Sequence, residues 1–150
     1  MSGGKVEALW IKRAVRGPMD AAAEVTLVED SGVLGSANQG GWRQVTVIEK
    51  EVFDRLAETL SPEVDPSMRR ANVMTSGIQL EGTRGMILRL GECRIELRGE
   101  THPCEQMDEA IPGLRDALRP RCRGGMFGKI IKGGVVRVGD FAELEQGNTE

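Results

Sequence analysis

Two stretches of the sequence carry residue types that could perform chemistry, and the first lies at residues 101–108. It reads Thr-His-Pro-Cys-Glu-Gln-Met-Asp, where a predicted strand ends and a helix is expected to begin. Pro103 suits the first helical position, so Cys104 falls in the first turn, where unpaired N–H groups and the helix dipole lower a thiol pKa. A thiolate there is a nucleophile or a soft metal ligand. Glu105 and Asp108 oppose ionisation, and a buried, inert cysteine is the alternative interpretation.

The other ionisable groups near this chemistry are one histidine and two more cysteines. In an extended segment, His102 would share a face with Cys104, about 6–7 Å away by strand rise. Cys93 begins a predicted strand and is expected in the core. Cys122 lies among arginines that would favour its thiolate, so it competes with Cys104 as the reactive thiol. Together, the three cysteines and His102 would supply the four ligands of a zinc ion, but their spacing does not resemble a zinc motif.

The second stretch, residues 119–132, carries five positive charges and no negative charge. Its arginines and its glycines could bind an anion, and phosphate is the best candidate; the residues concerned are Arg121, Arg123, Gly124 and Gly125. The spacing does not match a P-loop. A smaller basic patch contains Arg69, Arg70 and Asn72, and we predict that both patches face one cleft. A solvated basic loop is the alternative.

Short alternating runs with glycine turns predict a mainly β protein. Strands are predicted at 6–12, 24–28, 43–48 and 71–74, and hairpins at 86–90 with 94–98 and at 127–131 with 135–138. The longest helix is predicted at about residues 50–60, with short helical pieces at 103–111 and 113–118. The pattern indicates one domain over 1–150, a β-barrel or sandwich with short helical insertions, whose core covers about 6–140. The acidic tail, 141–150, is expected to fray.

The composition excludes several classes of function. Twenty Lys and Arg against 23 Asp and Glu give a formal net charge of −3, which offers no general attraction for nucleic acid or an anionic membrane. One histidine and no tyrosine exclude a histidine-based metal cluster and a tyrosine general acid. Three cysteines do not suggest a disulfide framework, and the N-terminus lacks the apolar core of a signal peptide. A cytoplasmic protein is therefore expected.

The order of these motifs resembles that of the MOSC domain family, named for the C-terminal domain of molybdenum cofactor sulfurases. The resemblance runs from about Val6 to Asp140. Its pieces are the run at 43–48, Arg69-Arg70-Ala71-Asn72, Gly91-Glu92, Thr101-His102-Pro103-Cys104, Arg123-Gly124-Gly125 and the run at 133–140. Two departures are the missing acid in Gly32-Val33-Leu34-Gly35-Ser36 and the histidine at position 102.

The resemblance implies a closed, mostly antiparallel β-barrel with helical decorations. It also implies that Cys104 carries sulfur or ligates molybdenum. The cofactor's phosphate and pterin would be held by the basic positions Arg69, Arg70, Arg121 and Arg123, together with Asn72. The family is also associated with pyridoxal phosphate, but nothing in the sequence indicates a Schiff-base lysine.

Three functions are consistent with this resemblance. The first is a MOSC domain on its own that binds molybdenum cofactor (molybdopterin) or carries sulfur on a cysteine. The second is an enzyme, either a molybdenum-dependent reductase or a sulfurtransferase, which in the redox case needs a separate electron donor. The third is a barrel that has lost its chemistry and serves as an interaction domain. The expected partners are molybdenum cofactor or a sulfur-donor protein, with no nucleic acid and no membrane.

Overall fold

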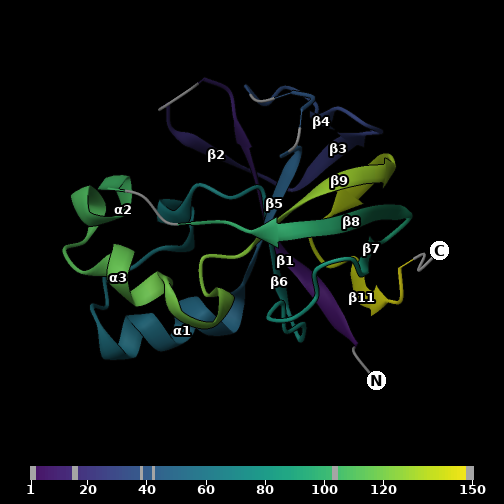
Figure 1. The fold of residues 1–150 in the computed structure, drawn as a ribbon. Helices are drawn as coiled ribbons and strands as arrows, with labels where there is room; N and C mark the ends of the chain where they lie inside the picture. The colour runs from purple at the N-terminus through teal and green to yellow at the C-terminus, as the bar shows by residue number, and fades with distance from the viewer. Residues whose placement is uncertain (1–2, 15–16, 38, 42, 103–104, 148–150) are drawn as a thin grey trace.

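The computed structural model describes residues 3–14, 17–37, 39–41, 43–102 and 105–147. Most of them form a β-barrel with helices gathered on one side (Figure 1). In chain order the elements are β1 (Gly4–Lys12), β2 (Met19–Ala22), β3 (Glu24–Val28), β4 (Gly32–Val33), β5 (Val45–Glu49), α1 (Lys50–Thr59), the 3-10 turn η1 (Pro66–Arg69), β6 (Val73–Ser76), β7 (Ile87–Leu90), β8 (Cys93–Glu100), α2 (Glu105–Ala110), α3 (Leu114–Leu118), the 3-10 turn η2 (Pro120–Cys122), β9 (Met126–Lys132), β10 (Gly134–Arg137) and β11 (Phe141–Glu145).

The barrel closes through the strand order β1-β11-β7-β8-β9-β5-β6 and back to β1. Neighbouring strands are antiparallel except β5 and β6, which run parallel. A parallel pair needs a crossover connection, and α1 with η1 provides it. A smaller sheet of β10, β3 and β4 packs beside the barrel. The mainly β barrel expected from the sequence is confirmed.

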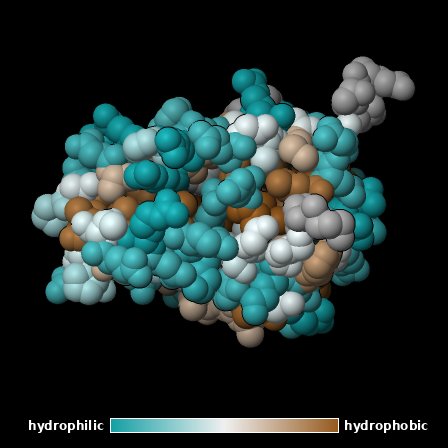
Figure 2. Space-filling model, turned by 90° about the horizontal axis from the view of Figure 1, so that it is seen from below, coloured by the Kyte–Doolittle hydropathy of each residue, from teal (hydrophilic) through white to brown (hydrophobic). Residues whose placement is uncertain are grey.

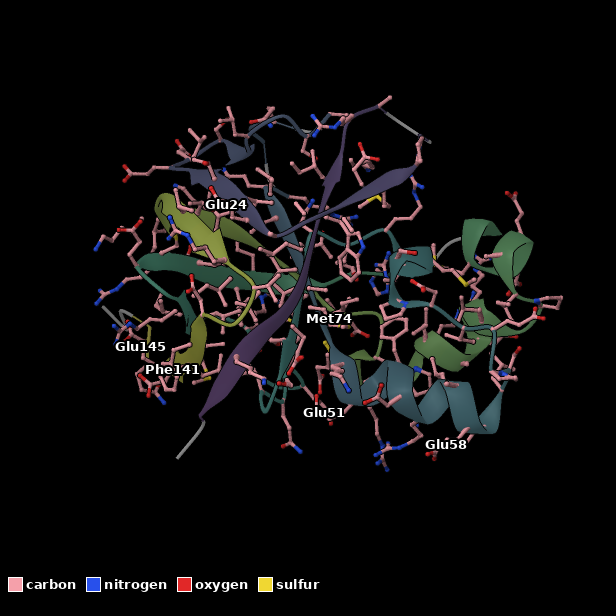
Figure 3. All side chains as sticks on the ribbon, turned by 180° about the vertical axis from the view of Figure 1, so that it is seen from behind. Glu24, Glu51, Glu58, Met74, Phe141 and Glu145 are labelled. Atoms are coloured by element: carbon pink, nitrogen blue, oxygen red, sulfur yellow. The ribbon has the colours of Figure 1, made fainter. Side chains whose placement is uncertain are left out.

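Alternation along the strands separates two apolar clusters. Val47 on β5 and Val73 on β6 point into the barrel, and the next residues on these strands, Ile48 and Met74, point out toward the helices. Figure 3 labels Met74 on the side of the sheet that faces α1. The outer cluster also takes the apolar side of α1, including Phe53, which fixes the helix against the barrel wall.

Two local predictions are confirmed closely. The helix predicted at about residues 50–60 is α1, and it is the longest helix among the described residues. The hairpin predicted at 86–90 and 94–98 is β7 with β8, where Leu90 pairs with Cys93 across the turn at Gly91. Gly91 has φ +57°, a left-handed conformation that suits glycine in a tight turn.

The second predicted hairpin, 127–131 with 135–138, is wrong. β9 pairs with β8 and β5, whereas β10 leaves the barrel and pairs with β3, with Val136 opposite Val25. The chain can turn away because Gly133 passes against the β3 backbone, where a Cβ would lie 2.4 Å from the carbonyl oxygen of Leu27. The glycines therefore mark a crossing between sheets.

The prediction that the chain frays after Gly139 is also wrong for residues 141–145. β11 pairs with β7 along its length and with the start of β1, where Lys5 lies opposite Phe141. Ala142 is fully buried in the barrel cluster. The segment that was expected to be a loose acidic tail is therefore the strand that closes the barrel.

Candidate functional site

A basic cavity of about 280 Å³ lies on the outer wall of the barrel over the start of β5. Thr46 lines it because Val45 and Val47, its neighbours on the strand, point into the barrel core. The lining comes from distant parts of the chain: Lys12, Ser36, Arg43, Gln44, Thr46, Arg69, Asn72, Thr101 and His102. These described lining residues include the basic side chains of Lys12, Arg43 and Arg69 and no carboxylate, so the cavity favours an anion.

Arg69 is the most deeply buried cation of this basic cavity. Its Nε donates to the carbonyl oxygen of Gly124 at 2.8 Å, and its Nη2 donates to the hydroxyl of Thr101. That hydroxyl in turn donates to the same Gly124 oxygen at 2.6 Å. The network joins η1 to the end of β8 and to the glycines before β9. It therefore fixes the strand end from which residues 102–104 continue.

Lys12 and Arg70 add positive charge at the same place. The pKa of Lys12 is lowered from its ordinary value, first because burial disfavours the ammonium and then because Arg70 and Arg69 repel it. Arg70 adopts a left-handed conformation with φ +65° and ψ +37°. Its Nη2 is buried and has no hydrogen-bond partner among the described residues. Cations crowded together with an unsatisfied donor indicate a missing acceptor.

Arg43 and Asn72 border the cavity from the segments that lead into β5 and β6. The guanidinium of Arg43 lies 4.8 Å from the ring centroid of Phe127, a cation–π distance. The side-chain oxygen of Asn72 accepts from the backbone N–H of Thr46 at 3.1 Å. This bond orients the amide, so that its –NH₂ group remains as a donor for a ligand.

The predicted site residues Arg69, Asn72 and His102 do come together in the basic cavity. His102 is exposed there. Pro103 and Cys104 lie outside the described residues, so the structure places His102 beside the cavity and leaves the role of Cys104 a prediction. In the sequence, Cys104 stands two residues after His102.

The predicted common cleft for both basic patches is not what the structure shows. Arg121 and Arg123 line a different cavity, over α1, and no described residue lines both that cavity and the basic one. Gly124 and Gly125 are buried, and Gly125 N–H donates to the carbonyl oxygen of Cys122 at 3.0 Å. Their carbonyls hold Arg69 and Thr101, so both glycines support the basic cavity from behind.

The structure does not favour the thiolate that the arginines around Cys122 suggested, so Cys122 is a weak competitor for the role predicted for Cys104. Burial raises the pKa of this thiol to about 12, and Glu100, Glu49 and Glu81 add to the shift. Arg119 and Arg121 are exposed, and they do not outweigh the desolvation of the thiol. Cys93 is in the barrel core as predicted, and burial raises its pKa to about 11. Both thiols are therefore protonated and poorly nucleophilic near neutral pH.

Six lining residues of the basic cavity were not singled out as site residues from the sequence: Lys12, Ser36, Arg43, Gln44, Thr46 and Thr101. Lys12 ends an alternating strand, and Thr101 opens the Thr-His-Pro-Cys motif, so the sequence position of each could have pointed to the site. The described residues contain no group of three or more His, Cys, Asp or Glu side chains arranged to hold a metal ion. Within the same part of the chain, no helix has the length and apolar character needed to cross a membrane.

Comparison with known proteins agrees with this architecture. A model of the MOSC domain matches residues 35–143. The crystal structure of the YuaD protein from Bacillus subtilis has a TM-score of 0.82 at 20% sequence identity, covering 97% of this chain and 97% of that chain. YiiM from Escherichia coli has a TM-score of 0.71 at 19% identity, covering 97% of this chain and 72% of its own. YiiM from Geobacillus stearothermophilus has a TM-score of 0.76 at 14% identity, covering 95% and 75%. No curated protein sequence matches the chain.

Proposed function

Because the chain belongs to the MOSC domain family, we propose that it binds molybdenum cofactor through the basic cavity. The family is linked to molybdenum cofactor and sulfur metabolism. The observation that carries the proposal is the charge of the cavity. Lys12, Arg43 and Arg69 line it, no described lining residue is acidic, and Arg70 next to it keeps a buried N–H without an acceptor.

The donor set fits the organic part of the cofactor, which carries a phosphate on a pterin. A phosphate dianion needs several strong donors; Lys12 and Arg43 line the cavity, and Arg70 lies close enough to Lys12 to lower the pKa of that ammonium. The amide of Asn72, held by Thr46, suits the polar edge of a pterin ring. Arg69 has a positioning role, because its Nε and Nη2 bond to the protein.

Cys104 completes the proposal as the metal ligand or as the carrier of a sulfur atom. Cys93 and Cys122 are buried with raised pKa values, so neither suits that role. When bound, the cofactor would supply a redox-active molybdenum centre. The chain's own residues would bind and orient the phosphate and pterin, and His102 lines the same cavity. A sulfur-donor protein or a separate electron donor is the partner that this function requires.

The test is cofactor loading in protein purified from a molybdenum-replete host. Molybdenum is measured by mass spectrometry, pterin by fluorescence after oxidation, and persulfide on Cys104 by peptide mass mapping. Cys104→Ser is expected to lose metal or persulfide while it keeps pterin. Lys12→Gln is expected to weaken binding of inorganic phosphate by roughly ten- to a hundredfold, since one charge-assisted hydrogen bond is lost. Lys132→Gln, at an exposed end of β9, is the matched control.

The outcomes separate the candidate functions. Metal and pterin on the wild type support cofactor binding, and a persulfide without metal supports sulfur carriage. Protein that carries none of the three, with phosphate affinity unchanged by Lys12→Gln, overturns the proposal and favours a barrel without chemistry. Turnover of an N-hydroxylated substrate by the loaded protein with an added electron donor would extend the proposal to a reductase.

A further inference from the structure

Gln44 lines the basic cavity, but its side-chain amide is bonded to the protein itself. The residue is only 4% exposed. Its Oε1 accepts from the backbone N–H of Ile130 at 3.0 Å. Its Nε2 donates to Oδ1 of Asp30 at 3.1 Å and to the carbonyl oxygen of Gly41 at 3.2 Å. A primary amide has two N–H donors, so both are in use and neither remains for a ligand.

These bonds tie the segment before β5 to two other parts of the chain. Ile130 belongs to β9, and Asp30 lies in the turn between β3 and β4. Asp30 is itself held, because its N–H donates to the carbonyl oxygen of Ile130 at 2.9 Å and its Oδ1 lies 3.6 Å from Nζ of Lys129. The backbone N–H of Gln44 donates to the carbonyl oxygen of Gly128 at 3.1 Å. Gln44 is therefore fixed through both its backbone and its side chain.

Arg43 stands between two of these fixed points, the carbonyl of Gly41 and the backbone of Gln44. Its side chain is exposed, and an exposed arginine ordinarily samples many rotamers. Here the guanidinium lies 4.8 Å from the ring centroid of Phe127. That ring has little room to move, because Gly99 faces it from β8 and a Cβ there would lie 2.9 Å from the ring. Stacking occupies the face of the guanidinium and leaves the N–H groups in its plane to donate.

The stack of Arg43 on Phe127 lies at the basic cavity. Phe127 is paired with Thr46 between β9 and β5, and directly paired residues share one face of a sheet. Thr46 lines the cavity, as Arg43 does. A donor that is ordered before the ligand arrives loses less conformational entropy on binding.

We propose that Gln44 is a positioning residue, which raises the affinity of the basic cavity for phosphate by holding Arg43 in place for binding through two N–H groups. The role rests on the proposed function, because phosphate is the ligand that the function assigns to this cavity. Gln44 itself does not touch the ligand, since its amide is bonded to Asp30, Gly41 and Ile130.

The test measures binding of inorganic phosphate by calorimetry. Gln44→Met keeps the length and the neutrality of the side chain but removes the three amide bonds. It should weaken phosphate binding roughly three- to tenfold, the equivalent of ordering one long side chain. The matched control is Gln79→Met, at an exposed position of the β6–β7 connection. Figure 2 views the molecule from below, the side on which α1 and this connection lie, and hydrophilic side chains cover much of that face.

A double-mutant cycle tests whether Gln44 acts through Arg43. In the Arg43→Gln background, Gln44→Met should change phosphate affinity by less than about twofold, because no guanidinium remains to be held. In the Lys12→Gln background it should keep its full effect, because Lys12 is carried by β1. The Nε–H signal of Arg43 in ¹⁵N spectra is a second readout. The ring current of Phe127 shifts this signal in the wild type, and the shift should fall in Gln44→Met.

Asp30→Gly tests the same role without altering the core. Asp30 is exposed and has φ +55°, which glycine adopts readily. Loss of a negative charge by itself would strengthen anion binding, whereas loss of a partner of the Gln44 amide should weaken it, by roughly twofold. Tighter phosphate binding in Asp30→Gly therefore overturns the positioning role.

The remaining outcomes separate this role from the proposed function. Unchanged phosphate affinity in Gln44→Met, with weaker binding in Arg43→Gln, overturns the role of Gln44 and leaves the function standing. Equal losses from Gln44→Met in the Arg43→Gln and Lys12→Gln backgrounds would also overturn it, because Gln44 would then support the cavity as a whole. Wild-type protein that binds no phosphate would refute the proposed function, and the positioning role would fall with it.

Discussion

Replacing Thr101 by valine tests the network that fixes the strand end before His102. Thr101 is only 3% exposed, and its hydroxyl accepts from Arg69 and donates to the carbonyl of Gly124. Valine has nearly the same shape, so it removes these bonds without opening a cavity. A buried guanidinium N–H then loses an acceptor. Bonds to charged groups contribute about 1.5–3 kcal/mol each, so we expect the free energy of unfolding to fall by about 2–3 kcal/mol.

The matched control is the same substitution at Thr75. Thr75 is fully buried on β6, and its hydroxyl has no hydrogen-bond partner among the described residues. Valine there removes an unsatisfied polar atom and should raise the free energy of unfolding by about 1 kcal/mol. The two variants thus differ in sign, although the side-chain change is identical.

The assay is urea unfolding followed by circular dichroism, with thermal unfolding as a second measurement. The Thr101 variant should lower Tm by roughly 4–12 °C, given a change of about 2–4 °C per kcal/mol for a chain of this size. The m-value should stay constant if both variants keep the same fold. A loss below about 0.5 kcal/mol at Thr101, or an equal loss at Thr75, would refute the hydrogen-bond reasoning.

Three further predictions test other parts of the structure. Gly125→Ala should be strongly destabilising in urea unfolding, by about 3 kcal/mol or more, because its φ is +96° and a Cβ would lie 2.2 Å from the carbonyl oxygen of Val47. Cys93 and Cys122 have raised pKa values of about 11 and 12, so the unfolded chain releases these protons first as the pH rises. The free energy of unfolding should therefore fall as the pH rises above about 9. If the double variant Cys93→Ala/Cys122→Ala shows the same dependence of this free energy on pH, the reasoning is contradicted. Truncation after Asp140 removes β11 and should abolish cooperative unfolding, whereas a native-like circular dichroism spectrum would show that the barrel closes without it.

Local patterns in the sequence determined those strands and helices whose apolar residues recur on one buried face. The strand predicted at 24–28 is β3 with the same bounds, because Val25 and Leu27 alternate with polar residues over a single turn-bounded run. The helix α1 follows from the spacing of Val52, Phe53 and Leu56. The Gly91 turn determined the β7–β8 hairpin. In each case the deciding contacts lie within a few residues, so periodicity and turn chemistry were sufficient.

The tertiary structure alone decided which distant segments meet. β10 follows β9 in the sequence but pairs with β3, and the acidic residues of β11 did not reveal that this strand closes the barrel. The two basic patches have similar composition, yet Arg69 lines the basic cavity and Arg121 lines a separate cavity over α1. Charge and residue type are local properties, whereas barrel closure and the burial of Cys122 depend on contacts between residues far apart in the chain. Those contacts set the direction in which each arginine points, and with it the ligand that each can bind.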